Sequence, residues 1–277
     1  MRIGVCCCAL AVALVTAGCE SKFYRPSQEM RSTSTDSYEI SMQKNGRIDI
    51  NLSTGAPVFQ NAFCMVWLDG EPAPRLIEID GRLGGREAVN NRLGEGQGMV
   101  YLQEDVDLLI GAYPTKPFLT AQAAFKNRGK HPVRVRMLMP WCVGDPKPGG
   151  LSLGGPAEQT VVIEGGRTFT ENDDVPRRVI GPTLSQWNLA AYSPASRRSL
   201  VAGFLTNIQG YTQIRIERTT EAAPDAFDRF RAECVYDPPV EVPPGSALKS
   251  EVLYLGVAEL DPLEGLAERE QLVERDP

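Results

Sequence analysis

The sequence is short of the residues that most catalytic and metal sites require. It contains a single histidine, His131, and no closely spaced cysteine pair of the kind that holds structural zinc follows its first residues. A Ser/His/Asp or Cys/His site would have to use His131, which lies in the turn-like segment RGKHPV with no catalytic motif around it. We therefore expect no catalytic residue of these classes, no metal and no cofactor.

Positive charge is also scarce. The 277-residue chain has 29 Lys and Arg residues against 35 Asp and Glu residues, which gives a net charge of −6. Nucleic-acid binding needs clustered Lys and Arg to displace counterions from phosphates, so this acidic composition argues against a nucleic-acid partner.

Cysteine is too sparse to build a disulfide scaffold. Three of the seven cysteines lie in the apolar first segment, and a fourth is Cys19. The others are Cys64, Cys142 and Cys234, which allow at most one disulfide within the chain. The sequence leaves open whether any two of them pair.

The first residues resemble a bacterial lipoprotein signal. Residues 1–18 combine a short basic start with an apolar run that ends at Gly18. The run is shorter than the ~20 residues that cross a bilayer and fits the hydrophobic region of a secretory signal peptide. It ends in VTAGC, which resembles a lipobox and implies cleavage after Gly18 and a diacylglyceryl group on the Cys19 sulfur. The alternative is an ordinary signal peptide with an incidental cysteine.

Membrane lipid is thus the expected partner of Cys19. Acyl chains contribute ~0.8 kcal/mol per buried CH₂, so several chains would hold a soluble domain firmly at a membrane. Glu20 and Ser21 follow, without the Asp that commonly retains such proteins in the inner membrane. We expect a lipid-anchored cell-envelope protein that faces the periplasm or the exterior, with the outer membrane favoured.

The rest of the sequence divides into a tether, a strand-rich domain and a short tail. Residues 19–37 are polar and Ser/Thr-rich, as expected of a flexible tether. Over residues 38–258, short runs such as VRVRMLM alternate apolar and polar residues between Gly, Pro, Asn and Asp. Residues 259–277 carry Asp261 as a helix N-cap. These patterns predict an all-β fold, a large antiparallel β-sandwich with a short C-terminal helix.

Two acidic segments are the remaining candidates for catalysis. Retaining glycoside hydrolysis needs two carboxyl groups ~5 Å apart that flank the scissile bond. The segment QEDVD contains Glu104, Asp105 and Asp107, and the segment TENDDVP contains Glu171, Asp173 and Asp174. Adjacent residues of a strand point to opposite faces, and both segments are typical of loops, so we interpret these acids as solvated turn residues.

Aromatic residues are better candidates for ligand contact. The face of a sugar is rich in C–H groups and stacks on aromatic rings, while nearby amides bind its hydroxyls. Trp67, inside FCMVWL, is expected in the core. Trp141 follows Pro140 at the expected end of a strand, where it can face a loop as readily as the core. Our candidates for binding carbohydrate or a partner are Trp141, Trp187, Asn188 and Tyr192.

Several segments resemble a known family. The main one is SQWNLAAYSPASRRSLVAGFLTNIQGYTQIRI, supported by DVDLLIGAYPTKPFLTAQAAFKN, MPWC and YLGVAELDPLEGLAER. They are similar to the amino-terminal β-supersandwich domain of the melibiase and raffinose-synthase-like α-galactosidase group, and the resemblance covers residues 38–269. It implies a supersandwich fold. In that group a segment resembling DPLEGLAE leads into a catalytic TIM barrel, whose nucleophile and acid/base aspartates have no counterpart position in this sequence.

These observations lead to an expected function. We expect a membrane-anchored, non-catalytic β-sandwich that binds carbohydrate or docks a separately encoded glycoside hydrolase barrel. The chain is not expected to be an enzyme by itself, because the barrel and its aspartates have no match in the sequence. Two alternatives stay open: an α-galactosidase-like hydrolase, split or truncated, and a purely structural envelope lipoprotein.

Overall fold

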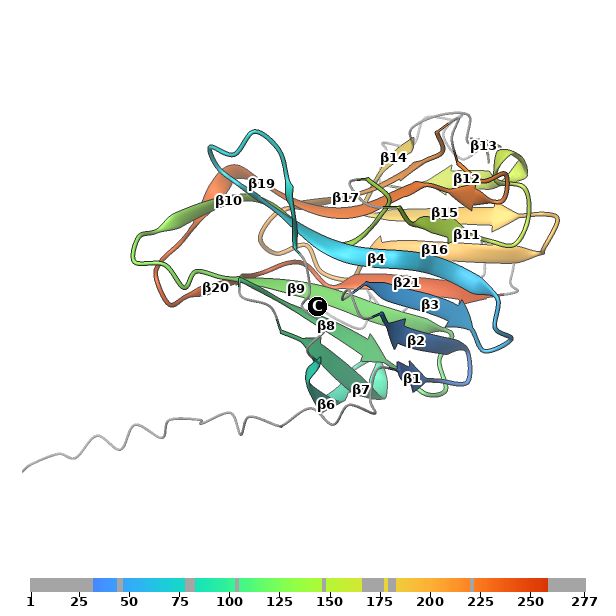
Figure 1. The fold of residues 1–277 in the computed structure, drawn as a ribbon, viewed down its shortest axis with the longest axis horizontal. Helices are drawn as coiled ribbons and strands as arrows, with labels where there is room; N and C mark the ends of the chain where they lie inside the picture. The colour runs from blue at the N-terminus through green and yellow to red at the C-terminus, as the bar shows by residue number, and fades with distance from the viewer. Residues whose placement is uncertain are drawn as a thin grey trace, which may run out of the picture.

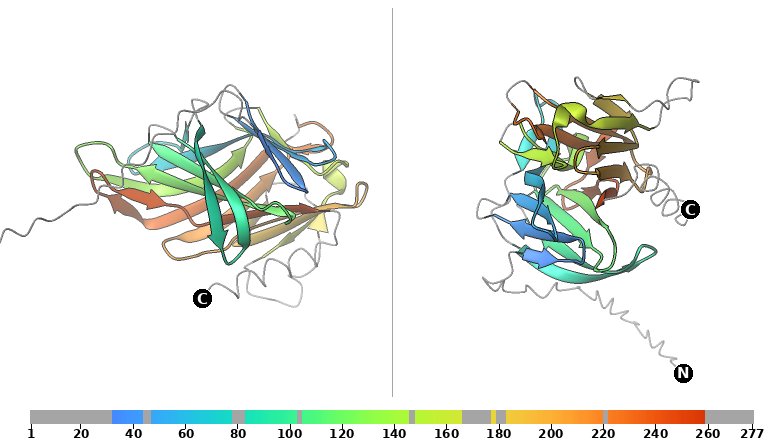
Figure 2. Two further views of the ribbon diagram at one scale, coloured as in Figure 1. Left: turned by 90° about the horizontal axis from the view of Figure 1, so that it is seen from below. Right: turned by 90° about the vertical axis from the view of Figure 1, so that its right-hand side faces the viewer.

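Two stacked antiparallel β-sheets make up the computed structural model of the protein (Figure 1 and Figure 2). The structure describes residues 32–43, 47–77, 83–102, 105–145, 148–165, 177–178, 183–219 and 222–258. These ranges contain strands and one 3-10 turn (Ala157–Gln159) but no α-helix, and hence no helix that could cross a membrane. The predicted all-β antiparallel sandwich is thereby confirmed. The predicted signal peptide (1–18) and helical tail (259–277) lie outside the described residues.

The first sheet contains the longest strands. Its main path runs through β1 (Ser32–Ser34), β2 (Tyr38–Met42), β3 (Ile48–Leu52), β4 (Pro57–Leu68), β10 (Val133–Val143), β19 (Arg229–Val242), β17 (Tyr211–Glu217) and β14 (Thr183–Gln186). Strands β5 (Arg75–Ile77) and β11 (Gly150–Ser152) pair with β4, and β18 (Ala226–Phe227) pairs with β11. Strand β1 falls inside the range expected for the tether, so strand structure already begins at Ser32.

The second sheet packs against the first. Its path runs through β13 (Arg177–Arg178), β12 (Val161–Glu164), β15 (Asn188–Ser193), β16 (Arg198–Phe204), β21 (Leu253–Ala258), β9 (Phe118–Lys126), β8 (Val106–Ala112), β7 (Gly94–Tyr101) and β6 (Leu83–Asn91), and β20 (Ala247–Lys249) pairs with β9. The strand pairs of both sheets are antiparallel.

The main core lies between the sheets, as the alternation of side chains predicts. Ile48 and Ile50 of β3 belong to it on the first sheet, and Leu200 and Ala202 of β16 belong to it on the second. A single cluster of buried side chains spans both sheets. Burial of apolar surface stabilises the stack by about 25 cal/mol per Å² removed from water.

Trp141 belongs to this core, which corrects the expectation that it is a candidate ligand contact. Strand β10 does not end at Pro140 but continues to Val143, because a register shift between Leu138 and Trp141 accommodates the proline as a bulge. The indole is fully buried and packs edge-on against Phe59, with ring centroids 5.7 Å apart. It therefore offers no ring face to a ligand.

Trp67 lies at the margin of a second, smaller apolar cluster. The members of this cluster alternate along β4 with side chains of the main core, so they face the other side of the first sheet: Phe63, Met65, Met137, Met139 and Cys142. The Trp67 Nε1–H donates to the Glu71 carbonyl at 2.9 Å, and the Arg136 guanidinium lies 5.8 Å from the ring centroid. Trp67 is thus a partly buried packing residue rather than a residue of the main core.

The three cysteines of the domain are buried free thiols. Burial raises the pKa of Cys64 to about 12 and holds the pKa of Cys142 well above its ordinary value. Cys64 belongs to the main core and Cys142 to the second cluster, so the two side chains face opposite sides of the first sheet. Neither of them, nor Cys234, is paired, which answers the question that the sequence leaves open.

Tyr38 joins the two sheets near the start of the domain. The side chain is buried, and its hydroxyl accepts a hydrogen bond from the Val257 N–H at 2.6 Å and also contacts the Pro117 carbonyl. Because Tyr38 lies on β2 of the first sheet and Val257 on β21 of the second, this bond fastens the sheets at the edge that contains β1 and β2.

Candidate ligand-binding surface

At the other edge of the first sheet, the chain passes into the second sheet through one residue. Strand β14 ends at Gln186 and β15 begins at Asn188, with Trp187 alone between them. The Trp187 N–H donates to the Thr212 carbonyl at 3.2 Å, and its own carbonyl accepts from the Phe204 N–H at 3.0 Å. Since Thr212 belongs to the first sheet and Phe204 to the second, both sheets fix the backbone of this residue.

The crossing forces Trp187 into a backbone conformation that favours glycine. Its φ angle is +68°, in the left-handed region. A side chain with a Cβ atom in this region costs of order 1–3 kcal/mol, and bulky residues adopt it rarely. Such strain persists only where the surrounding contacts determine the backbone, and it is enriched at functional sites.

The Trp187 side chain lies against the loop 205–210, which joins β16 to β17. With the Asn207 amide assigned to the orientation that satisfies both of its ends, its oxygen accepts from the Trp187 Nε1–H at 3.2 Å and its nitrogen donates to the Gly210 carbonyl at 2.6 Å. The ring nevertheless remains 48% exposed. Its orientation is therefore fixed, while much of its surface stays accessible.

A buried carboxylate holds the same loop. One oxygen of Glu251, a residue that is only 4% exposed, accepts hydrogen bonds from the Ile208 and Gln209 N–H groups, each at 2.8 Å. Next to it, the Val252 N–H donates to the Thr206 hydroxyl at 3.0 Å. Hydrogen bonds to an ionised acceptor are stronger than neutral ones, so the loop backbone is firmly placed.

Exposed apolar side chains gather at this crossing. Within the described residues, the large hydrophobic side chains that remain exposed are Leu184 (38%), Trp187 (48%), Ile208 (82%) and Tyr211 (51%). The strand register places β14 beside β17, and loop 205–210 leads directly into Tyr211. We call these four residues, together with the exposed amides Gln186, Asn207 and Gln209, the corner surface.

The structure does not bring Asn188 and Tyr192 to this surface with Trp187. A Cβ atom built on Gly165 would lie 1.5 Å from Asn188 Oδ1, so the Asn188 side chain packs over that glycine. Tyr192 lies four residues farther along β15, or about 13 Å away, and pairs with Val161 of β12. The predicted group therefore separates into three locations, and only Trp187 remains at the corner surface.

Ile208, Tyr211 and Leu184 are surface residues that the sequence analysis missed. Tyr211 opens the alternating run YTQIRIE, in which it shares the exposed face with Arg215. Alternation thus marks Tyr211 as outward-facing once the inward face is identified. Ile208 has no comparable signal, because an isolated apolar residue in a loop is as compatible with packing as with exposure.

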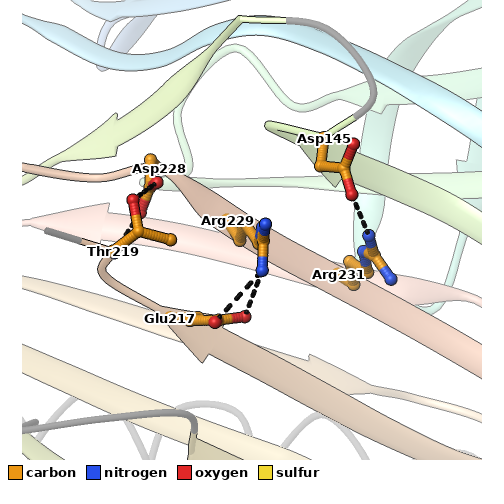
Figure 3. Close-up of polar contacts among 6 residues, drawn as sticks. All are labelled: Asp145, Glu217, Thr219, Asp228, Arg229 and Arg231. Atoms are coloured by element: carbon orange, nitrogen blue, oxygen red, sulfur yellow. Dashed lines mark hydrogen bonds and ion pairs between the residues drawn. The ribbon is translucent and has the colours of Figure 1, made fainter. Parts of the chain in front are cut away.

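Beyond Tyr211, the outward face of β17 and β19 carries paired charges (Figure 3). Both carboxylate oxygens of Glu217 lie 3.1 Å from Arg229 Nη1, and Asp145 lies 3.8 Å from Arg231 Nη2. Exposed ion pairs of this kind contribute about 0–1 kcal/mol each. They connect neighbouring strands and leave these acids engaged with arginines.

The acids considered for catalysis are also engaged where the structure describes them. Asp105 lies 3.2 Å from Arg75, and Asp107 forms an ion pair with Lys126. Residues 104, 171, 173 and 174 lie outside the described residues. His131 is exposed between β9 and β10. The described part of the chain holds no group of three or more His, Cys, Asp or Glu side chains that could bind a metal ion.

Glycine and alanine substitutions measure the strain at Trp187. Both remove the ring, but only glycine adopts a φ of +68° without steric cost. We expect Trp187→Gly to be more stable than Trp187→Ala by about 1 kcal/mol in urea unfolding. Leu184, in the extended strand β14, is the matched control, because there the alanine variant should be the more stable of the two. Equal stabilities of the two Trp187 variants would contradict a strained backbone.

No protein-family model matches the sequence, and neither does any curated protein. Solved structures do match the fold. The GH36 α-galactosidase AgaA from Geobacillus stearothermophilus, in complex with stachyose, superposes with a TM-score of 0.57 at 11% identity, over 88% of this chain and 42% of that one. An α-galactosidase from Lactobacillus brevis superposes with a TM-score of 0.50 at 10% identity, over 86% of this chain and 40% of that one.

A third structure matches over almost its whole length. It is a protein from Escherichia coli K12 provisionally assigned as an aldose 1-epimerase, with a TM-score of 0.52 at 13% identity, covering 83% of this chain and 98% of that one. The chain thus spans about two fifths of the length of each galactosidase, 42% of one and 40% of the other. At these identities the likeness establishes a shared fold: the amino-terminal β-sandwich of GH36 α-galactosidases and the aldose-epimerase sandwich.

Proposed function

We propose that this protein is a lipid-anchored envelope protein whose β-sandwich recognises carbohydrate without catalysing a reaction. The observation that carries the proposal is Trp187, which is held at a positive φ and remains 48% exposed. The fold gives a second line of support, since its structural neighbours include α-galactosidases and a protein provisionally assigned as an aldose 1-epimerase.

The geometry of the corner surface suits a sugar. An indole stacks on the C–H face of a pyranose, and the amides beside it bind the hydroxyl groups at the sugar's edge. Asn207 and Glu251 fix the ring and the loop before any ligand arrives. Such preorganisation reduces the entropy lost on binding.

The engagement of the buried Glu251 carboxylate supports a role without catalysis. Glycosidic bond cleavage needs one carboxyl group that can donate a proton and a second that attacks or activates water. Among the described residues, the acid that contacts loop 205–210 is Glu251, which is buried and accepts hydrogen bonds from two backbone N–H groups. This carboxylate supports the loop rather than facing a substrate.

Docking of a separately encoded glycoside hydrolase barrel is the second candidate. It is favoured by the match to AgaA, in which the part that superposes on this protein makes up 42% of the galactosidase chain. A partner could supply what the rest of that chain supplies there. In that case a protein would cover the corner surface, since aromatic side chains are enriched at such interfaces.

Tryptophan fluorescence tests carbohydrate recognition directly. Of the three tryptophans Trp187 is the most exposed, so a stacked sugar should shift its emission to shorter wavelength. We expect α-galactosides or cell-wall glycans, titrated into the full chain, to give a saturable shift that disappears in Trp187→Phe if indole stacking produces it. The absence of any glycan response would rule out the sugar-binding version, and hydrolysis of a nitrophenyl galactoside would establish an enzyme instead.

The anchor has its own test. Lipid on the Cys19 sulfur should place the full chain in the membrane fraction, and Cys19→Ala should release it or leave the signal uncleaved. Cell fractionation with radiolabelled palmitate reports both outcomes, and Cys64→Ala serves as the matched cysteine control. Membrane association and labelling that survive Cys19→Ala would contradict lipidation at this position.

A further inference from the structure

We infer that the corner surface selects neutral oligosaccharides over acidic ones. This inference rests on the proposed function and deepens it, because it names the chemical class of glycan. It is carried by the charge, the hydrogen-bonding groups and the backbone support of the surface.

The segment that builds the corner surface is almost without charge. Residues 183–214 contain two charged side chains, Arg197 and Arg198, although charged residues make up 23% of the chain. These arginines lie at the hairpin between β15 and β16, at the end of β15 opposite Trp187. The five steps from Asn188 to Ser193 correspond to about 17 Å at the rise of a β-strand, more than a Debye length at physiological salt.

The polar groups of the surface are amides. Gln186, Asn207 and Gln209 are exposed beside the rings of Trp187 and Tyr211. A carboxamide both donates and accepts hydrogen bonds, as a sugar hydroxyl does, so the two match without any ionised group. A surface built from aromatic rings and amides is therefore complementary to uncharged, hydroxyl-rich ligands.

The rings of Trp187 and Tyr211 have no cation beside them among the residues of this segment, because Arg197 and Arg198 lie at its distant hairpin. The first charged side chain along β17 is Arg215, which is the cross-strand neighbour of Leu184. Its Nε lies 3.1 Å from the carboxylate of Glu233, a side chain that is 3% exposed. Arg215 is 47% exposed, but its charge is already balanced by the buried Glu233, so an acidic sugar on the rings would gain less from it than from an unpaired cation. The charge of such a sugar is also repelled by a protein of net charge −6.

Hydrogen bonds to the loop backbone hold the corner surface in one conformation, so its preference for neutral ligands does not depend on a rearrangement. Glu251 accepts hydrogen bonds from the N–H groups of Ile208 and Gln209, so the loop that carries the Asn207 and Gln209 amides keeps its position. The Glu251 charge itself is buried below the loop and adds to the repulsion of a ligand carboxylate.

Matched sugars provide the test. The full chain is titrated by calorimetry with tetrasaccharides of galactose, glucose and mannose. Each neutral tetrasaccharide is compared with the corresponding uronate tetrasaccharide, in which a carboxylate replaces the hydroxymethyl group at C6. We expect at least one neutral tetrasaccharide to bind at least about tenfold more tightly than its uronate partner. A tenfold ratio corresponds to a difference of about 1.4 kcal/mol in binding free energy. Trp187→Ala should lower the neutral affinity by a similar factor, and Gln209→Lys should narrow the neutral-to-acidic ratio.

Tyr192→Ala is the control, because Tyr192 lies along β15 away from the corner surface, and this variant should bind like the wild type. Uronates that bind as tightly as their neutral partners overturn the inference and leave the proposed function standing. Neutral binding that survives Trp187→Ala also overturns it, since the site is then elsewhere. Failure of every tetrasaccharide and glycan to bind overturns the proposed function and, with it, this inference.

Discussion

The structure depends on how the chain closes the gap between its two sheets at one edge. Stacked sheets lie about 10 Å apart, and most proteins bridge that distance with a loop or a bent strand. Here a single residue, Trp187, makes the turn, and it reaches the required direction only at a φ of +68°. The Ser185 hydroxyl lies beside the turn and accepts a hydrogen bond from the Gly165 N–H at 2.7 Å, so β12 and β14 are held together there. The tight crossing leaves the Trp187 side chain pointing away from the core.

The contacts that support the crossing also build the surface. Hydrogen bonds from Trp187 reach both sheets, and Asn207 and Glu251 fix the loop on which the indole rests. The strain of about 1–3 kcal/mol is small beside the burial of the shared core, which stabilises the sandwich as a whole. A glycine would serve the turn better than a tryptophan does. The proposed glycan contact would account for a large aromatic residue at this position.

The strands and their buried faces can be predicted from the periodicity of the sequence. The backbone conformation and exposure of individual residues cannot. Alternation and turn residues indicated an antiparallel sandwich, and strands such as β3 bury every second residue as expected. Trp141 was misplaced because Pro140 reads as the end of a strand, whereas a β-bulge carries β10 past it. Trp187 is exposed, whereas Asn188 and Tyr192, which are close to it in the sequence, lie elsewhere in the structure. Alternation marks Tyr211 as outward-facing, but its proximity to β14 comes from the pairing of β14 with β17, which no local pattern encodes.

The central claim is that a neutral glycan lies on the corner surface, and a binding footprint tests it most directly. Hydrogen exchange of the full chain, measured by mass spectrometry with and without a saturating neutral oligosaccharide, locates the ligand without altering any residue. The account predicts slower exchange in peptides that cover residues 184–188 and 205–213, with little change along β6 and β7. Protection that falls on other strands while these two segments exchange as before would contradict it.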